Sequence, residues 1–496
     1  MARTTTRPTP TLEGQILAVL RTIRGWTQAQ LEQAAGLRRD AVSDYERGKV
    51  QLLRDELQRL VLILGFNPCL IERAASFIRL ARSFTGAGAP LPDGPLHQRI
   101  ELVAARAGED ETNRIRGLLS VLLQEGEWLE ARRAAPGLWK RLRPYKAEER
   151  RVLVQESEDF WSWALVELLC EESIKAAADS PQRAVELAEL AVFISEQVPG
   201  DNTFRARVQG YGRGFLGNAW RVCGQLRVAE AEFSRVRVLW PEDAPLEAGL
   251  LDGTRLLDLE ASLLRERRKL NRALDLLDRA LAARPRGPGA IRLLVKKGKT
   301  LEEMGQYEAG LAALRRATML MDDETEPRLR LCVGFNRLTL LCHLEQAMEA
   351  NRLLPEVRQL AVQQNQRMDL LRLRWLEGKI CAGLGRIQEA KEALDRVRQE
   401  FSAVSIAYDA ALASLELAAV LLREGEGQKV RDLVREMIPV FTSEGVHKEA
   451  QGALGLFVRS VQEDCATVAL TQIIVRYLYR AQHDPDFRFE LPSEIS

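Results

Sequence analysis

Long apolar runs are absent from this sequence. The chain has 496 residues, and its uninterrupted apolar stretches are short, such as Leu60 to Leu64. A membrane-spanning helix needs roughly 18 such residues. The first residues, MARTTTRPTPTLEG, contain no apolar core of the kind found in a secretory signal. We therefore expect no membrane segment and a cytoplasmic location.

Cysteine and histidine are few and scattered. The seven cysteines form no CxxC pair, which favours reduced, mostly buried thiols over a disulfide framework. The four histidines are equally dispersed, so no metal-ligand spacing occurs. We expect no metal and no other cofactor. The cysteines are residues 69, 170, 223, 332, 342, 381 and 465, and the histidines are residues 97, 343, 447 and 483.

Neither sign of charge is in excess. Lys and Arg number 71 and Asp and Glu number 70, so the net charge is +1 and any nucleic-acid contact must be local. What the chain does contain is 46% hydrophobic and 28% charged residues, with many Ala, Leu, Glu, Arg and Gln and few β-branched runs. This composition predicts an all-α protein.

Apolar residues at helical spacing predict five short helices before residue 82, at about 12–24, 28–35, 38–47, 53–64 and 68–82. Thr27 and Gln30 fit a capping box at the start of the second helix. Gly36 suits a tight turn because it tolerates positive φ. Two short helices joined by a glycine turn, with helices on both sides, give the helix-turn-helix layout.

The string GWTQAQLEQAAGLRRDAVSDYERGK, from Gly25 to Lys49, resembles the phage-repressor (XRE) type of helix-turn-helix. The resemblance covers about residues 12–66. It implies DNA binding, and it implies a buried structural pair between Arg21 and Glu46. One position departs from the family pattern, because Glu32 stands where the family usually has alanine. A carboxylate there must reach solvent or find a partner.

The third helix would present its polar residues outward, from Arg38 to Arg47, and Gln28 and Lys49 match family positions that usually contact phosphates. Arg39 would donate to guanine O6 and N7, and Asp44 would accept from cytosine N4. Residues 1–66 hold ten Lys or Arg and seven Asp or Glu, a modest excess, so we expect a homodimer on double-stranded DNA. The alternative is a solvated helix face on a domain that binds a protein partner. The predicted DNA-binding residues are Gln28, Arg38, Arg39, Asp40, Ser43, Asp44, Arg47 and Lys49.

Residues 83–97, SFTGAGAPLPDGPLH, hold three glycines and three prolines. Such a composition is typical of a flexible or partly extended linker. We therefore predict a DNA-binding domain at 1–82, a linker at 83–99 and a helical array at 100–496.

An internal repeat dominates the array. Residues 210–243 resemble the 34-residue tetratricopeptide repeat through Gly217, Trp220, Gly224 and Ala229, and 291–324 and 371–404 fit the same template. The resemblance implies an α-solenoid of helical hairpins that ends in capping helices near 446–482. Equivalent second-helix positions recur at intervals longer than 34 residues: Ala184, Ala229, Ala273, Gly310, Ala347, Ala390 and Val430.

Two glycine motifs imitate nucleotide-binding loops. Gly212 to Gly217 match GxGxxG, and Gly298-Lys299-Thr300 resembles the end of a phosphate-binding loop, but no strand precedes either. No arrangement suggests a catalytic site. We expect that the protein is not an enzyme.

First-helix residues of tetratricopeptide repeats line a concave groove. Asn side chains there could bind a peptide backbone, and cations could bind a carboxylate. The alternative is a solvated face with acidic neighbours such as Asp258, Glu302 and Glu303. The predicted groove residues are Asn218, Arg221, Arg265, Lys299, Asn336, Trp375 and Lys379.

The sequence thus predicts a DNA-binding transcriptional regulator whose array binds a peptide or protein ligand or mediates oligomerisation. The alternative is an interaction scaffold whose helix-turn-helix contacts protein rather than operator DNA.

Overall fold

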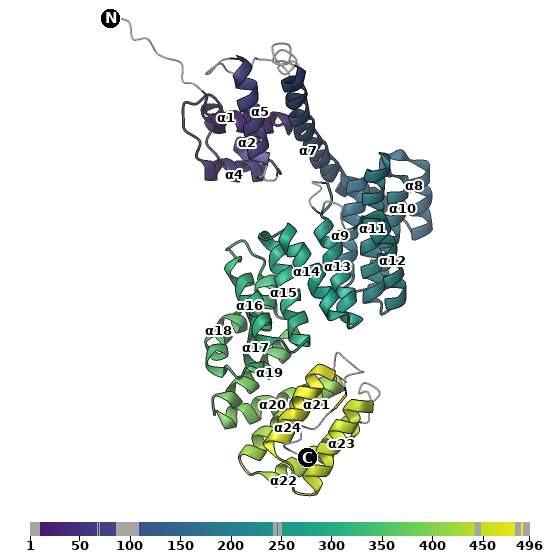
Figure 1. Cartoon of the computed structure of the whole chain (residues 1–496), viewed down its shortest axis with the longest axis vertical. Helices are drawn as coiled ribbons and strands as arrows, with labels where there is room; N and C mark the ends of the chain where they lie inside the picture. Colours follow the sequence, from purple (N-terminus) through teal and green to yellow (C-terminus); the bar gives the residue numbers. More distant parts are fainter. Residues whose placement is uncertain are drawn as a thin grey trace, which may run out of the picture. The chain divides into compact units, whose positions relative to one another are not determined.

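The computed structural model describes residues 10–66, 68, 70–85, 109–241, 246, 250–404, 406–441, 448–481 and 488–489. Regular structure in these ranges is helical, apart from turns, as the composition predicts (Figure 1). The predicted linker at 83–99 lies almost wholly outside the described residues. Within them, no helix is both long and apolar enough to cross a membrane.

Five helices form the N-terminal head, which we define as residues 12–85. They are α1 (Leu12–Ile23), α2 (Gln28–Ala35), α3 (Ala41–Glu46), α4 (Arg54–Ile63) and α5 (Leu70–Thr85). Their apolar faces meet in one core that includes Leu17, Leu31, Val42, Leu60 and Phe77. The prediction of five helices is confirmed.

The third helix is shorter than the sequence predicts. It begins at Ala41 rather than Arg38, because Asp40 has a φ of 65° and cannot continue a right-handed helix. Arg38 and Arg39 therefore lie in the turn before the helix.

The long helix α7 (Glu109–Leu142) contributes to the core of the head, since its Leu122 is fully buried there. Gly126 of α7 faces α1 so closely that an added Cβ would lie 2.9 Å from Ile23 Cγ2. The head and α7 thus share one core, although the predicted domain boundary separates them.

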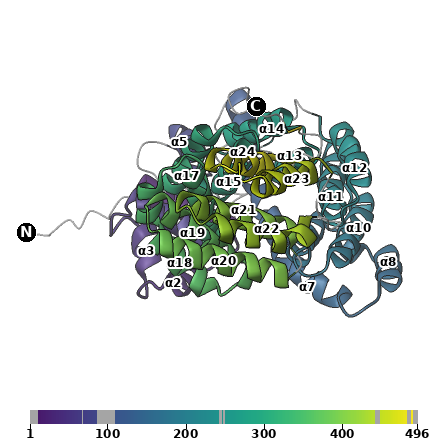
Figure 2. The ribbon, with the colours of Figure 1, turned by 90° about the horizontal axis from the view of Figure 1, so that it is seen from below.

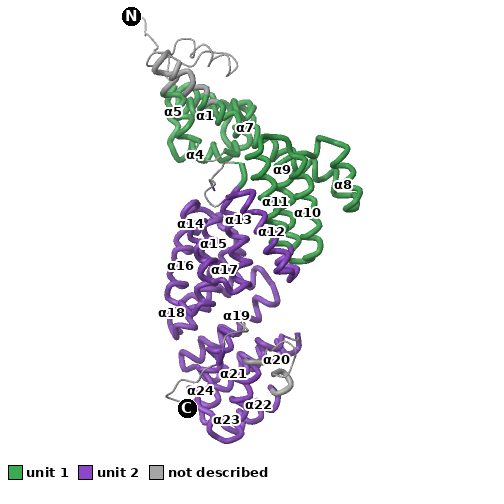
Figure 3. Tube along the Cα trace, turned by 45° about the vertical axis from the view of Figure 1, so that its right-hand side comes forward, with its two compact units in different colours: residues 1–219, 249–251 green, residues 220–248, 252–496 purple. Residues whose placement is uncertain are grey.

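The chain divides into two compact units, drawn in different colours in Figure 3. Unit 1 comprises residues 1–219 and 249–251, and unit 2 comprises residues 220–248 and 252–496. Unit 1 contains the head, α7, α8 (Ala147–Glu156), a short 3₁₀ helix (Glu158–Phe160), and the pair α9 (Trp163–Ala176) and α10 (Pro181–Gln197).

Unit 2 is built from helix pairs, which we call the array. The helix α11 (Asn202–Val222) crosses from unit 1 and is followed by α12 (Leu226–Leu239). The pairs within unit 2 are α13 (Gly253–Glu266) with α14 (Leu270–Ala283), α15 (Gly287–Glu303) with α16 (Tyr307–Met319), α17 (Pro327–His343) with α18 (Ala347–Gln364), α19 (Arg367–Gly383) with α20 (Ile387–Ala403), and α21 (Ala407–Arg423) with α22 (Gly427–Phe441).

Each pair turns through one residue with positive φ, two positions before the second helix. Glycine fills most of these positions, as at Gly305 (φ 75°), but Arg268 and Glu345 take the same conformation. Counting from this turn, Ala350 rather than Ala347 is the buried second-helix position of the α17–α18 pair. Our prediction of Ala347 was wrong by almost one helical turn.

Glycines also let the two helices of a pair approach. A Cβ on Gly298 would lie 2.9 Å from Leu314 Cγ, and one on Gly378 would lie 2.9 Å from Leu394 Cγ. Both glycines lie in segments that fit the repeat template, 291–324 and 371–404, and the structure places them where the two helices of a pair pack closely. They serve helix contact, not phosphate binding.

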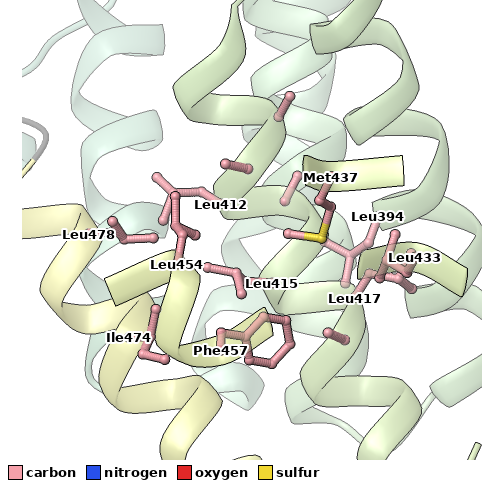
Figure 4. Close-up of a cluster of buried hydrophobic side chains, with 14 of the residues drawn as sticks. Leu394, Leu412, Leu415, Leu417, Leu433, Met437, Leu454, Phe457, Ile474 and Leu478 are labelled. Carbon is pink, nitrogen blue, oxygen red and sulfur yellow. The ribbon is translucent and has the colours of Figure 1, made fainter. Parts of the chain in front are cut away.

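Two further helices, α23 (Lys448–Gln462) and α24 (Val468–Ala481), complete unit 2. They bury Phe457, Ile474 and Leu478 in one cluster with Leu415 of α21 and Met437 of α22 (Figure 4). Tyr479 extends the contacts of α24 to α17 and α19. The ribbons of these helices are labelled in Figure 2. Helix α24 therefore contacts helices well inside the array as well as those at the end of the array.

Candidate nucleic-acid interface and ligand cavity

Helix α2 is capped at both ends. Thr27 and Gln30 form the predicted capping box, with Gln30 N donating to Thr27 Oγ1 at 3.2 Å and Thr27 N donating to Gln30 Oε1 at 2.8 Å. Gly36 ends α2 with a φ of 64°. The first turn of α3 lacks a cap from its own N-cap residue, Asp40.

Glu32 supplies that cap from α2. Its side chain is buried, and its Oε1 accepts a hydrogen bond of 3.0 Å from the Val42 backbone N–H. The carboxylate that departs from the family pattern has therefore found a partner, and it satisfies a donor that the short helix leaves open.

Arg21 on α1 and Glu46 on α3 form a two-pronged ion pair. Arg21 Nε donates to Glu46 Oε1 at 2.6 Å and Nη2 donates to Oε2 at 3.1 Å. Gln28 Nε2 also donates to Glu46 Oε2 at 2.6 Å, so the predicted phosphate contact already has an intramolecular partner. This network fixes α3 against α1 and α2.

The predicted DNA-binding residues separate into an exposed and a covered set. Ser43 is only 8% exposed, so its predicted outward position is wrong. In a helix of six residues, the three consecutive positions Ala41, Val42 and Ser43 are all covered by the head. The exposed set comprises Arg38, Arg39, Asp40, Arg47 and Lys49.

Ion pairs already occupy part of the exposed set. Asp44 pairs with Arg38 at 2.7 Å and with Lys49 at 3.4 Å. The hydrogen bond from Arg38 keeps the pKa of Asp44 below its ordinary value. Among the described residues, the side chains of Arg39 and Arg47 have no such partner. These two guanidinium groups are available to bind an external anion.

Sequence reasoning missed the contact between the head and α7. Arg24 is buried and its Nη1 lies 2.7 Å from Glu130 Oε1. The Trp26 ring has Arg24 at 5.7 Å and Arg133 at 5.4 Å from its centroid. Burial lowers the pKa of Arg24. The only signal in the sequence was the tryptophan in the string that joins α1 and α2.

Four of the seven predicted groove residues line one cavity of about 430 Å³ in unit 2. Aromatic rings from α16, α17, α19 and α24 form much of its wall, and Arg372 lies on it exposed, with no charged partner among the described residues. The four predicted residues are Lys299, Asn336, Trp375 and Lys379.

The other three lie elsewhere. Asn218 is buried in α11 and belongs to unit 1. Arg221 pairs with Glu266. Arg265 lies behind the cavity wall, 3.5 Å from Glu303. The template predicts which helix face is concave, but not which of its residues are already engaged.

A buried carboxylate lies at one end of the cavity. Burial opposes ionisation of Glu302, but Lys299, 3.1 Å away, and His343 together outweigh it, and the pKa of Glu302 is about 2. His343 Nε2 lies 3.8 Å from Glu302 Oε1, and burial lowers the pKa of His343. Among the described residues, no donor reaches Glu302 Oε2.

Tyr479 of α24 also lines the cavity. Its hydroxyl donates to Glu416 Oε1 at 2.7 Å and accepts from Lys379 Nζ at 3.0 Å. Trp375 stacks on its ring at 6.1 Å between centroids, and His343 meets it edge-on at 5.1 Å. Predicted groove residues Trp375 and Lys379 therefore hold a side chain of the protein itself.

Comparison with known proteins supports the description of the head. The model of a helix-turn-helix domain family matches residues 14–74. None of the curated proteins matches the chain.

Solved structures similar to the chain include three helical proteins. A tetratricopeptide repeat protein from Parabacteroides merdae is 14% identical, with 56% of this chain and all of that chain covered and a TM-score of 0.37. Aspartyl phosphate phosphatase F from Bacillus subtilis is 12% identical, with 90% and 97% covered and a TM-score of 0.40. A signal transduction ATPase with a tetratricopeptide repeat sensor from Pyrococcus horikoshii is 12% identical, with 91% and 72% covered and a TM-score of 0.42.

These scores are too low to carry an argument about function. The architecture rests on the helices themselves, their turns and the matched segment. The chain has a helix-turn-helix domain at residues 14–74, followed by a tetratricopeptide-like array of helix pairs.

Proposed function

We propose that the protein is a sequence-specific DNA-binding transcriptional regulator of the phage-repressor type, which binds its operator as a homodimer. One observation carries the proposal: Arg39 and Arg47 are exposed on the helix-turn-helix and have no ion-pair partner among the described residues. Arginine on this motif is suited to bidentate contact with guanine and to phosphate contact.

The array supplies the regulatory part of the proposal. Its cavity combines aromatic walls with charged groups of both signs, which suits a peptide or protein segment. We assign no catalytic step to the chain. Within unit 1, Leu122 and Glu130 of α7 contact the head directly.

The test begins with selection of bound duplexes from a random pool by the whole protein. Affinity for the selected duplex is then measured between 50 and 200 mM salt. Phosphate contacts predict a linear fall of log affinity with log salt, by about 0.9 for each phosphate neutralised. Arg39→Ala should lower the affinity by about 1–3 kcal/mol and relax the preferred sequence at one position.

Arg47→Ala should weaken all duplexes alike and reduce the salt slope by about one. Arg59→Ala is the matched control, because Arg59 is also exposed on the head but pairs with Glu56 at 2.9 Å. If no duplex is enriched and binding shows no salt dependence, the regulator proposal fails and the scaffold alternative stands.

A further inference from the structure

The side chain of Tyr479 is held as a bound ligand would be. It reaches its partners from a helix that lies far along the chain, and all of them are on first helices of other pairs: His343 on α17, Trp375 and Lys379 on α19, and Glu416 on α21. The phenol has both an acceptor and a donor at its hydroxyl and an aromatic partner for its ring. Such a set of partners is what specific recognition of a tyrosyl group requires.

The partners are themselves mostly shielded from solvent. The Lys379 and Glu416 side chains are 15% and 11% exposed, and their charged atoms lie 3.1 Å apart. Trp375 Nε1 donates to the second oxygen of Glu416, which leaves the carboxylate oriented toward the phenol. If the phenol left and nothing replaced it, these desolvated charged groups would lose a hydrogen-bond partner, and the folded protein would be less stable.

Open space lies on both sides of this tyrosine. One side is the cavity of about 430 Å³, and the other is a second cavity of about 340 Å³ between α17, α19, α21 and α24. His343, Lys379 and Tyr479 line both cavities. Tyr479 therefore lies, with His343 and Lys379, where the two cavities adjoin.

The C-terminal part of α24 is held by both polar and apolar contacts. Besides Tyr479, the Tyr408 hydroxyl donates to the Leu478 carbonyl at 2.7 Å. Arg476 and Arg480 of the same turn are exposed. The apolar anchors Ile474 and Leu478 face the opposite cluster with α21 and α23. The Tyr479 side chain can thus be exchanged for another phenol, while the apolar anchors keep α24 in place.

We propose that the pocket around Tyr479 is a recognition site for a peptide that carries a tyrosine, and that the side chain of Tyr479 is its built-in occupant, displaced when such a peptide binds. The proposal rests on the ligand-binding role proposed for the array, and it names the chemistry of the ligand: an aromatic side chain with a hydroxyl, flanked by residues that extend into the two cavities.

The test uses the whole protein and a fluorescently labelled peptide with the sequence of α24, VALTQIIVRYLYRA. Wild-type protein should bind it weakly, because the attached tyrosine competes at a millimolar effective concentration. Full-length Tyr479→Ala should bind it at least tenfold more tightly. Tyr145→Ala, which removes an exposed tyrosine of unit 1, should bind as the wild type does.

A second peptide, with phenylalanine at the position of Tyr479, tests recognition of the hydroxyl. It should bind the Tyr479→Ala protein several-fold more weakly than the tyrosine peptide, since Glu416 and Lys379 lose a partner. Adding Glu416→Gln to Tyr479→Ala should reduce this preference. Full-length Tyr479→Phe, which keeps the ring, should show an intermediate affinity and faster amide hydrogen exchange in α24.

The proposal is overturned if the folded Tyr479→Ala and Tyr479→Phe proteins bind the peptide no better than wild type, or if the two peptides bind equally. It is also overturned if neither variant folds, because α24 would then be an indispensable part of the core. Both readouts are made without DNA. Loss of DNA binding with intact peptide binding would refute only the regulator role, and the reverse result would refute only this pocket.

Discussion

Glu32 on α2 and the Val42 backbone on α3 are joined by a hydrogen bond of 3.0 Å that caps the N-terminus of α3. A helix of six residues cannot satisfy its own first N–H groups, and Asp40, in a left-handed conformation, does not help. A carboxylate from the neighbouring helix both accepts the donor and faces the positive end of the helix dipole.

Glu32→Ala should therefore weaken α3 rather than restore a family-like packing. We expect a loss of about 1–2 kcal/mol, seen as faster amide hydrogen exchange across residues 41–46. Glu32→Gln keeps an acceptor and should lose less. Gln33→Ala, on the exposed side of the same helix, is the control. Unchanged exchange in Glu32→Ala would show that the cap does not stabilise α3.

Leu122→Ala should destabilise the head although Leu122 lies well beyond the head in the sequence. The side chain is fully buried among the residues of α1, α4 and α5, and such truncations cost about 2–5 kcal/mol. The neighbouring Leu123 is 42% exposed, and Leu123→Ala should change stability by less than about 0.5 kcal/mol. Urea unfolding followed through Trp26 distinguishes them. Equal effects would mean that α7 does not belong to this core.

Glu345→Gly should stabilise the α17–α18 pair. Glu345 takes a φ of 59° at a turn position that is glycine in several other pairs, and this conformation costs a residue with a Cβ about 1–2 kcal/mol. The exposed ion pair with Arg476 contributes little in return. Glu345→Ala removes the charge but keeps the strain, so it should not stabilise. Thermal unfolding that moves equally in both variants would rule out backbone strain as the cause.

His343 should make unit 2 less stable as the pH falls below about 6.5. Burial lowers the pKa of His343, so the unfolded chain takes up a proton that the folded chain refuses, and stability falls with the pH. Glu302, with a pKa of about 2, loses its own contribution only below pH 4.5, outside this range. The ionisable groups that face His343 from other helices are Lys299, Glu302, Tyr307, Lys379 and Tyr479.

The check compares the fall in unfolding temperature between pH 7.5 and pH 5.5 in wild type and His343→Asn. The variant should fall less. A parallel fall in both proteins would show that other groups dominate in this range. Because His343 also borders the Tyr479 pocket, the peptide affinity of each protein can be measured under the same conditions.

Local patterns in the sequence predicted the head well. Apolar spacing, the Thr27–Gln30 box and Gly36 act within a few residues, so they place α1, α2 and the turn. The start of α3 was missed because nothing in the pattern shows that Asp40 adopts positive φ. Ser43 was missed because exposure depends on how neighbouring helices cover such a short helix.

Long-range contacts were beyond the sequence patterns. The template identified Lys299, Asn336, Trp375 and Lys379 as residues of one concave face, since helical spacing fixes that face. The template could not show that Tyr479, a hundred positions after Lys379, lines the same cavity and contacts Lys379. For the same reason, the sequence patterns did not predict that α7 contributes to the core of the head.

The shared core of the head and α7 also bears on how the protein can be cut. A fragment that ends at residue 82 would leave an empty slot where Leu122 packs, and the buried Arg24 would lose Glu130. The apolar surface of this fragment would be exposed to water and would favour aggregation. Assays of operator affinity therefore need the head together with α7, so the smallest useful piece extends at least to Leu142.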